Sequence, residues 1–234
     1  MTEGKELPVT ESPREIEHLT NKEGEWEVVH ESGRKDCFTY FNKLTQQFLR
    51  VRDYPEDGSS NIDTELDIFR KSVTGLEELK DLIKIVDFDG KPAILSPNFG
   101  LTFPALILQA AEQGTRLPPS FFKRMIKNAQ EMVERGVYKT FDKALRTDEH
   151  IVCYVVKGEI CFAFLDPDAK ESGFLENKET SKEFIELSIG RLAKEYYGYS
   201  AEEVSNAEDI ELDDLKGLSL RDLTPVSLED NAGF

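Results

Sequence analysis

The chain has 234 residues, of which 39% are hydrophobic and 32% are charged, and its formal net charge is −17 at pH 7. This length corresponds to one domain, or to one domain with a small appendage. The strong negative charge disfavours binding to nucleic acids and to anionic membrane surfaces, because both repel an acidic protein.

The cysteines and the N-terminal segment favour a reducing compartment. Cys37, Cys153 and Cys161 are too few, and odd in number, for a disulfide framework. Residues 1–20 lack the apolar stretch of a secretory signal, and the longest apolar run, near residues 103–111, is too short to span a bilayer. We therefore expect a soluble cytoplasmic or nuclear protein that does not bind membranes.

The N-terminal quarter of the chain predicts an arm, a small sheet and a linker. Residues 1–23 are polar and show no periodicity, which is typical of a flexible arm. Residues 24–52 contain three strand-like runs separated by turn-forming clusters, a pattern that predicts an antiparallel β-meander. Proline, glycine and serine within residues 55–60 predict a linker.

The meander carries aromatic and turn residues at a recognisable spacing. These positions are Trp26, Gly33-Arg34, Tyr40-Phe41-Asn42 and Thr45. Together they make residues 24–55 resemble a WW domain. In that family the first tryptophan and the central aromatic hold the fold and the asparagine ties a loop. The resemblance implies the same roles for the matching residues here.

The positions that bind ligands in WW domains differ in this chain. Thr39 and Arg50 stand where that family has its ligand-binding aromatic side chains. Proline-rich peptides dock between two aromatic faces, so the resemblance implies a small fold without the usual ligand. No family resemblance is found for residues 60–234.

Residues 61–206 combine helical periodicity with two hairpins. Apolar spacing predicts helices near residues 62–73, 102–114, 118–136 and 181–197, with shorter ones at 74–83, 140–146 and after 200. Hairpins are predicted at residues 84–95, around Asp89-Gly90, and at residues 151–165, around Lys157-Gly158. Asp63 is a candidate helix N-cap, and Pro92 indicates an edge strand or a bulge.

The order of these elements predicts the fold class. Strands occur as hairpins and do not alternate one by one with helices, which disfavours a doubly wound parallel sheet. We expect an α+β protein with a small N-terminal antiparallel β-meander and a larger domain of helices and antiparallel hairpins. Residues 207–234 form an acidic, leucine-containing tail.

No histidine or cysteine pattern identifies a catalytic or metal site. The three histidines lack ligand spacing to one another and to the cysteines, so we expect neither a metal nor a cofactor. Cys153 and Cys161 lie within the predicted hairpin and face opposite sides of its sheet, which excludes a disulfide between them. A nucleophile formed by either cysteine with His150 is disfavoured, because buried apolar thiols are unreactive.

Paired carboxylates provide the main catalytic alternative. Asp87 with Asp89, and Asp166 with Asp168, could support acid–base chemistry in a small-molecule site built from loop carboxylates. Both pairs flank turns, where aspartate has an ordinary structural role. An enzyme is therefore the second hypothesis, and no catalytic residue is identified.

Charge is segregated along the chain. Residues 115–157 contain nine basic and five acidic residues, whereas residues 166–234 contain 18 acidic and seven basic ones. Mixtures of acidic residues and leucine are typical of segments that order on a partner. The basic side of the helix at 118–136 and the tail leucines therefore form the candidate interaction surface, namely Lys123, Arg124, Lys127, Leu212, Leu215 and Leu218.

These observations favour a non-catalytic protein-interaction or regulatory protein that binds through residues 61–206 and the tail. The expected partner is another protein, and a basic one would complement the net charge. A further hypothesis is intramolecular: the tail docks on residues 115–157 and competes there with an external partner. A third reading, beside the enzyme, is an acidic binder or inhibitor of a basic protein.

Overall fold

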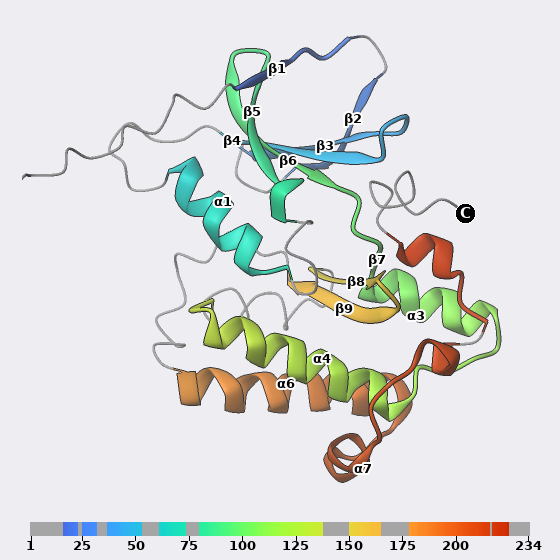
Figure 1. Ribbon diagram of the computed structural model, residues 1–234. Coiled ribbons are helices and arrows are strands. Elements are labelled where there is room, and N and C mark those ends of the chain that lie inside the picture. Colours follow the sequence, from blue (N-terminus) through green and yellow to red (C-terminus); the bar gives the residue numbers. More distant parts are fainter. Residues whose placement is uncertain are drawn as a thin grey trace, which may run out of the picture.

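The computed structural model describes residues 16–22, 25–31, 37–52, 61–73, 80–137, 150–164, 178–215 and 217–224 (Figure 1). It contains two mostly antiparallel sheets and several helices, which confirms the predicted α+β class. Residues 1–15 of the predicted arm at 1–23, the linker, the helix at 140–146 and Asp166 with Asp168 lie outside the described residues. The rest of the predicted arm contains a strand, Glu17–Leu19, which pairs in parallel with residues 86–88, so this part of the chain is not a free arm.

The larger sheet has six strands in the order β1-β5-β6-β4-β3-β2. Their bounds are β1 (Glu17–Leu19), β2 (Trp26–Glu31), β3 (Cys37–Asn42), β4 (Gln47–Arg52), β5 (Lys84–Phe88) and β6 (Lys91–Pro97). All neighbouring strands are antiparallel except β1 and β5. The predicted meander is β2–β3–β4, and it joins the first hairpin through the pairing of β4 with β6.

The six-stranded sheet curls strongly. Trp26 lies on edge strand β2, yet its ring packs edge-on against Phe88, with ring centroids 5.9 Å apart. Phe88 belongs to β5, next to the opposite edge of the sheet, and it also contacts Tyr40 at 5.2 Å. Trp26 therefore finds an aromatic partner across the curl, and the concave face encloses a small core of its own.

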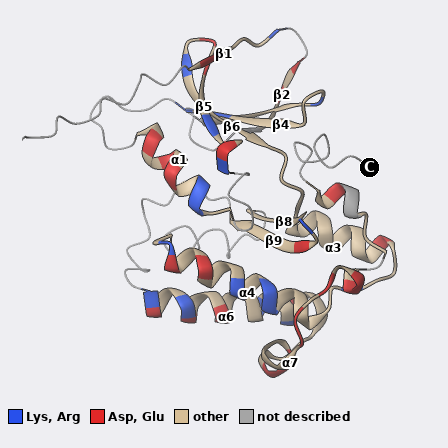
Figure 2. Ribbon diagram, viewed as in Figure 1, with Lys and Arg blue, Asp and Glu red and all other residues tan. Residues whose placement is uncertain are grey.

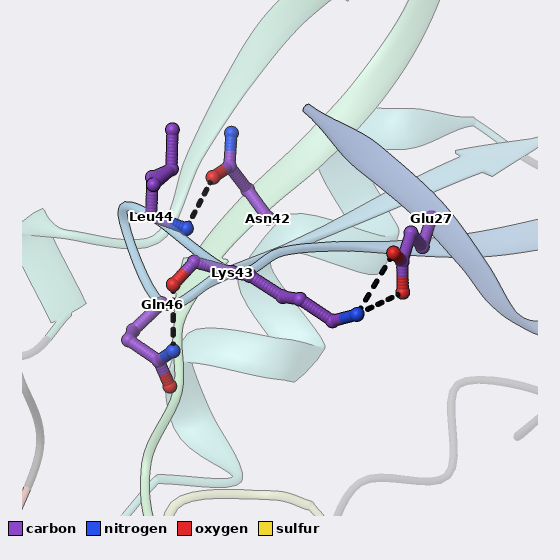
Figure 3. Close-up of polar contacts among 5 residues, drawn as sticks. All are labelled: Glu27, Asn42, Lys43, Leu44 and Gln46. Carbon is purple, nitrogen blue, oxygen red and sulfur yellow. Dashed lines mark hydrogen bonds and ion pairs between the residues drawn. The ribbon is translucent and has the colours of Figure 1, made fainter. Parts of the chain in front are cut away.

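The turn between β3 and β4 is held by side chains (Figure 3). Asn42 accepts a hydrogen bond at Oδ1 from the backbone nitrogen of Leu44, at 2.9 Å. The ammonium group of Lys43 lies 2.8 Å from the Glu27 carboxylate on β2. The backbone carbonyl of Lys43 accepts a hydrogen bond from Gln46 Nε2. Asn42 thus ties the loop, which is the role that we expect for it, and the relation to WW domains stays a prediction.

The smaller sheet has the strand order β7-β8-β9. Its strands are β7 (Leu101–Thr102), β8 (Ile151–Val156) and β9 (Glu159–Phe164). The predicted hairpin is confirmed, with Lys157 at φ 49° and Gly158 at φ 81° in its turn. Cys153 is opposite Phe162, and Cys161 is opposite Tyr154, so the two thiols enter different core clusters, as predicted.

The helices agree with the predicted periodicity. They are α1 (Ile62–Lys71), α3 (Phe103–Glu112), α4 (Pro119–Glu134), α6 (Lys178–Tyr197) and α7 (Ala201–Asn206), followed by the 3₁₀ turns η1 (Leu212–Leu215) and η2 (Leu220–Leu223). No helix among the described residues has both the length and the apolar composition that a membrane span requires.

Two local predictions were wrong. The N-cap of α1 is Asn61, whose side chain accepts a hydrogen bond from the Thr64 nitrogen at 2.8 Å, and Asp63 lies within the first turn. Strand β6 is interior, because it pairs with both β4 and β5. Pro92 is tolerated there because the described β4 pairing ends opposite Ala93, so the missing N–H interrupts no ladder bond to β4.

The small sheet lies between two apolar layers (Figure 1). One face packs on α3, α4 and α6 in the largest core cluster, and the other faces α1 and the convex side of the six-stranded sheet. A buried ion pair between Arg52 on β4 and Glu65 on α1 joins the larger sheet to this helix. The β8–β9 hairpin is therefore the centre of the fold.

Candidate functional site: a basic cleft between α4, α6 and α7

Helix α4 has one buried face and one face that lines a cleft. Its buried stripe includes Met125, Ala129 and Met132, which pack in the largest core cluster. Lys123 and Lys127 lie one turn apart on the side that faces the cleft. Because apolar residues recur at three- and four-residue spacing, the basic residues are left together on one side of the helix.

The cleft has a volume of about 460 Å³ and lies between α4, α6, α7 and the segment that follows α7. Its lining includes Lys123, Arg124, Lys127, Gly190, Val204 and Ile210. The structure thus brings all three predicted basic residues into one concave site. Figure 2 shows the basic positions of α4 and the acidic positions of α7 and of the segment after it.

Two ammonium groups in this cleft have no carboxylate partner among the described residues. Lys123 donates its side-chain hydrogen bond to the backbone carbonyl of Ala207, which is a neutral acceptor. Lys127 is exposed and makes no hydrogen bond or ion pair with any described residue. Neither positive charge is paired with a carboxylate of the described residues.

Arg124 has a structural role that the sequence did not predict. Its Nε donates to the carbonyl of Ile160 at 3.0 Å, and its terminal nitrogen lies 2.9 Å from the Glu159 carboxylate. One turn later on α4, Asn128 accepts a hydrogen bond from the Phe162 nitrogen at 3.1 Å. Arg124 therefore covers part of the β9 edge that faces away from β8, and it contributes less of its charge to the cleft than the two lysines.

The tail leucines lie away from the cleft. Leu215 and Leu218 are buried in the largest core cluster, and Leu212 is half-buried against it. From the segment between α7 and η1, Asp209 and Ile210 line the cleft. The predicted surface is thus divided, with the basic residues at the cleft and the leucines in the core.

Acidic residues also line the cleft and connect its walls. Glu186 on α6 accepts a hydrogen bond from Gln130 on α4 at 2.7 Å. Beyond this end of the cleft, Glu134 binds Lys178 at 2.8 Å and Lys182 at 2.6 Å. The hydrogen bonds and charges of these two lysines lower the pKa of Glu134 from 4.5 to about 2. These contacts connect α4 and α6 beside the cleft.

The catalytic alternatives find little support in the described geometry. Burial raises the pKa of the Cys153 thiol, and also that of Cys161, so both thiols are protonated at neutral pH. Asp87 accepts a hydrogen bond from the Gly90 nitrogen at 3.0 Å within the β5–β6 turn. Asp89 faces the backbone nitrogen of Asn21 at 3.3 Å. No group of three potential metal ligands occurs within the described ranges.

Several lining residues were missed by sequence reasoning. Gly190 in the interior of α6 offered a signal, because glycine is unfavourable in a helix unless space or conformation requires it. Glu186, Val204 and Ile210 offered none, since only the packing of α6 and α7 against α4 brings them to the site. No known family model and no curated protein matches this chain.

Proposed function

We propose that this protein is a non-catalytic interaction protein whose cleft between α4, α6 and α7 binds an acidic segment of a partner protein. The observation that carries the proposal is the pair Lys123 and Lys127, whose ammonium groups lack carboxylate partners in the described part of an acidic chain. Charge complementarity of this kind attracts and orients a partner.

The two carboxylates of the lining restrict how a partner binds. Glu186 and Asp209 repel acidic groups from their part of the cleft, whereas Lys123 and Lys127 attract them. An acidic segment is therefore expected to lie along α4, with its charges beside the lysines. This arrangement favours a peptide with spaced acidic residues over a small dianion.

Fluorescence anisotropy with labelled peptides tests the proposal. The probes are peptides of alternating acidic residues and leucine, with matched peptides that carry Asn and Gln in place of Asp and Glu. We expect the acidic peptides to bind with Kd values of about 100 μM or lower, and more weakly as salt rises. Binding no tighter than about 1 mM, or equal binding of the amide peptides, would overturn the proposal.

Charge-reversal variants locate the binding. Lys127→Glu should weaken binding about tenfold or more, equivalent to about 1.4 kcal/mol, because it places a carboxylate beside the bound acid. Lys194→Glu is the matched control, since it makes the same charge change at an exposed position of α6 that does not line the cleft. Equal effects of the two variants would show that the cleft is not the site.

A basic partner protein is the second candidate. Exposed carboxylates of Glu202, Glu208, Glu211 and Asp213 follow one another along α7 and the next segment, and they favour a basic surface. Labelled lysine-rich peptides in the same assay distinguish the two candidates. If the lysine-rich peptides bind tightly both to the wild-type protein and to Lys127→Glu, the basic partner is supported.

A further inference from the structure

Gly190 lies in the interior of the 20-residue helix α6 and lines the cleft. Its backbone has no positive φ, so the helix conformation does not require glycine. A Cβ atom added at this position would meet no described atom within 4 Å, so packing does not require glycine either. Glycine is nevertheless among the least favourable residues in a helix interior. The fold alone therefore gives no reason for this residue.

The surroundings of Gly190 combine apolar side chains with two positive charges. Ile126 on α4, Val204 on α7 and Ile210 line the same cleft, and Lys123 and Lys127 carry its positive charge. An apolar side chain that entered here would be removed from water by these residues, and neighbouring acidic groups would reach the lysines.

We infer that Gly190 provides the space for one apolar side chain from the acidic segment bound in the cleft. This inference rests on the proposed function and specifies its ligand as a segment with an apolar residue between acidic ones. The chain itself places one acidic residue and one neighbouring apolar residue in the lining of this cleft. Asp209 and Ile210 both line the cleft, beside the Ala207 carbonyl that Lys123 binds.

The test replaces Gly190 by a residue that fills the space. Gly190→Leu should bind the acidic leucine peptides at least tenfold more weakly than the wild-type protein, with a melting temperature no lower than that of the wild type. Lys194→Leu is the matched control, because it adds the same side chain at an exposed position of the same helix that does not line the cleft. It should leave peptide affinity unchanged.

A second measurement changes the peptide and does not depend on the stability of the variant. Replacing the central leucine of the peptide by alanine should weaken binding to the wild-type protein about tenfold. The same replacement should have little effect on binding to Gly190→Leu, because the leucine side chain of the variant occupies the space. This coupling between peptide and protein is the signature of direct contact.

The possible outcomes separate the inference from the proposed function. If the wild-type protein binds no acidic peptide, the proposed function fails. If it binds them, and Gly190→Leu binds them equally well, the cleft binds peptides but Gly190 does not accept a side chain. The inference would also be overturned if the leucine-to-alanine change in the peptide weakened binding equally to the wild-type and variant proteins.

Discussion

Gly100 shows how a single residue determines strand pairing. It precedes β7 and has φ 153°, and a Cβ atom there would lie 2.3 Å from the carbonyl oxygen of Cys153 on β8. The next residue, Leu101, pairs with Cys153. Only a residue without a side chain lets the backbone approach β8 so closely.

Gly100→Ala should therefore destabilise the protein by about 2–4 kcal/mol, because β7 must move away from β8. Urea denaturation measures this change. Gly190→Ala is the control, since its Cβ meets no described atom within 4 Å and should stabilise α6 by up to about 1 kcal/mol. Equal stabilities of Gly100→Ala and wild type would show that β7 does not pair as described.

At the scale of elements, α4 protects the edge of β9. The Phe162 nitrogen donates to Asn128 at 3.1 Å, and the Ile160 carbonyl accepts from Arg124 at 3.0 Å. An exposed strand edge can pair with another chain, so side chains that occupy its polar groups oppose aggregation. The same two residues attach the helix that carries Lys123 and Lys127 to the central hairpin.

Asn128→Leu should cost about 1–3 kcal/mol of unfolding free energy, because it leaves the buried Phe162 N–H without its acceptor. The measurement is again urea denaturation. Lys127→Leu, one residue earlier and exposed, should change stability by no more than about 0.5 kcal/mol. If Asn128→Leu leaves the unfolding free energy unchanged, the Phe162 N–H has another partner in solution.

The contact between α4 and α6 should depend on pH through Glu134. Its pKa in the folded protein is about 2, below the ordinary 4.5, because Lys178 and Lys182 bind the ionised form. The resulting stabilisation is complete above about pH 4.5 and is lost as pH falls through about 2. NMR titration of the Glu134 carboxyl carbon should give the lowered pKa. In 1 M salt this pKa should rise toward 4.5. A pKa of 4.5 at low salt would contradict the contact.

At the scale of the whole molecule, the tail contributes to the core. Leu215, Leu218 and Leu223 are buried in the cluster that α3, α4 and the β8–β9 hairpin share. Apolar burial, more than charge, is therefore expected to hold the tail, and Leu223→Ala should cost about 2–5 kcal/mol. Docking of this kind should persist in 1 M salt, where exposed ion pairs are screened.

Removal of the tail tests the intramolecular hypothesis. A chain truncated after residue 206 should show faster amide exchange within residues 118–136 than the full chain, because α4 loses apolar cover and the Lys123–Ala207 contact. Full-length Leu223→Ala is a milder control that keeps the Ala207 carbonyl. If exchange in α4 is identical with and without the tail, the charge asymmetry serves solubility alone.

Elements with local sequence signals could be predicted before the fold was known. Turn residues at Lys157-Gly158 and alternation on either side predicted the β8–β9 hairpin and the opposite faces of Cys153 and Cys161. Apolar spacing predicted α4, and with it the common side of Lys123 and Lys127. These features depend on residues within a few positions of one another, so a single sequence is sufficient to predict them.

The way in which these elements combine depends on contacts between distant parts of the chain. The pairing of β4 with β6, the contact of Trp26 with Phe88 and the use of Arg124 on the β9 edge join residues far apart in the chain. The walls of the cleft come from α4, α6 and α7, and the opening at Gly190 exists only where these helices meet. Long-range contacts depend on the complementary shapes of whole packed surfaces, which leave no periodic signal in any one segment.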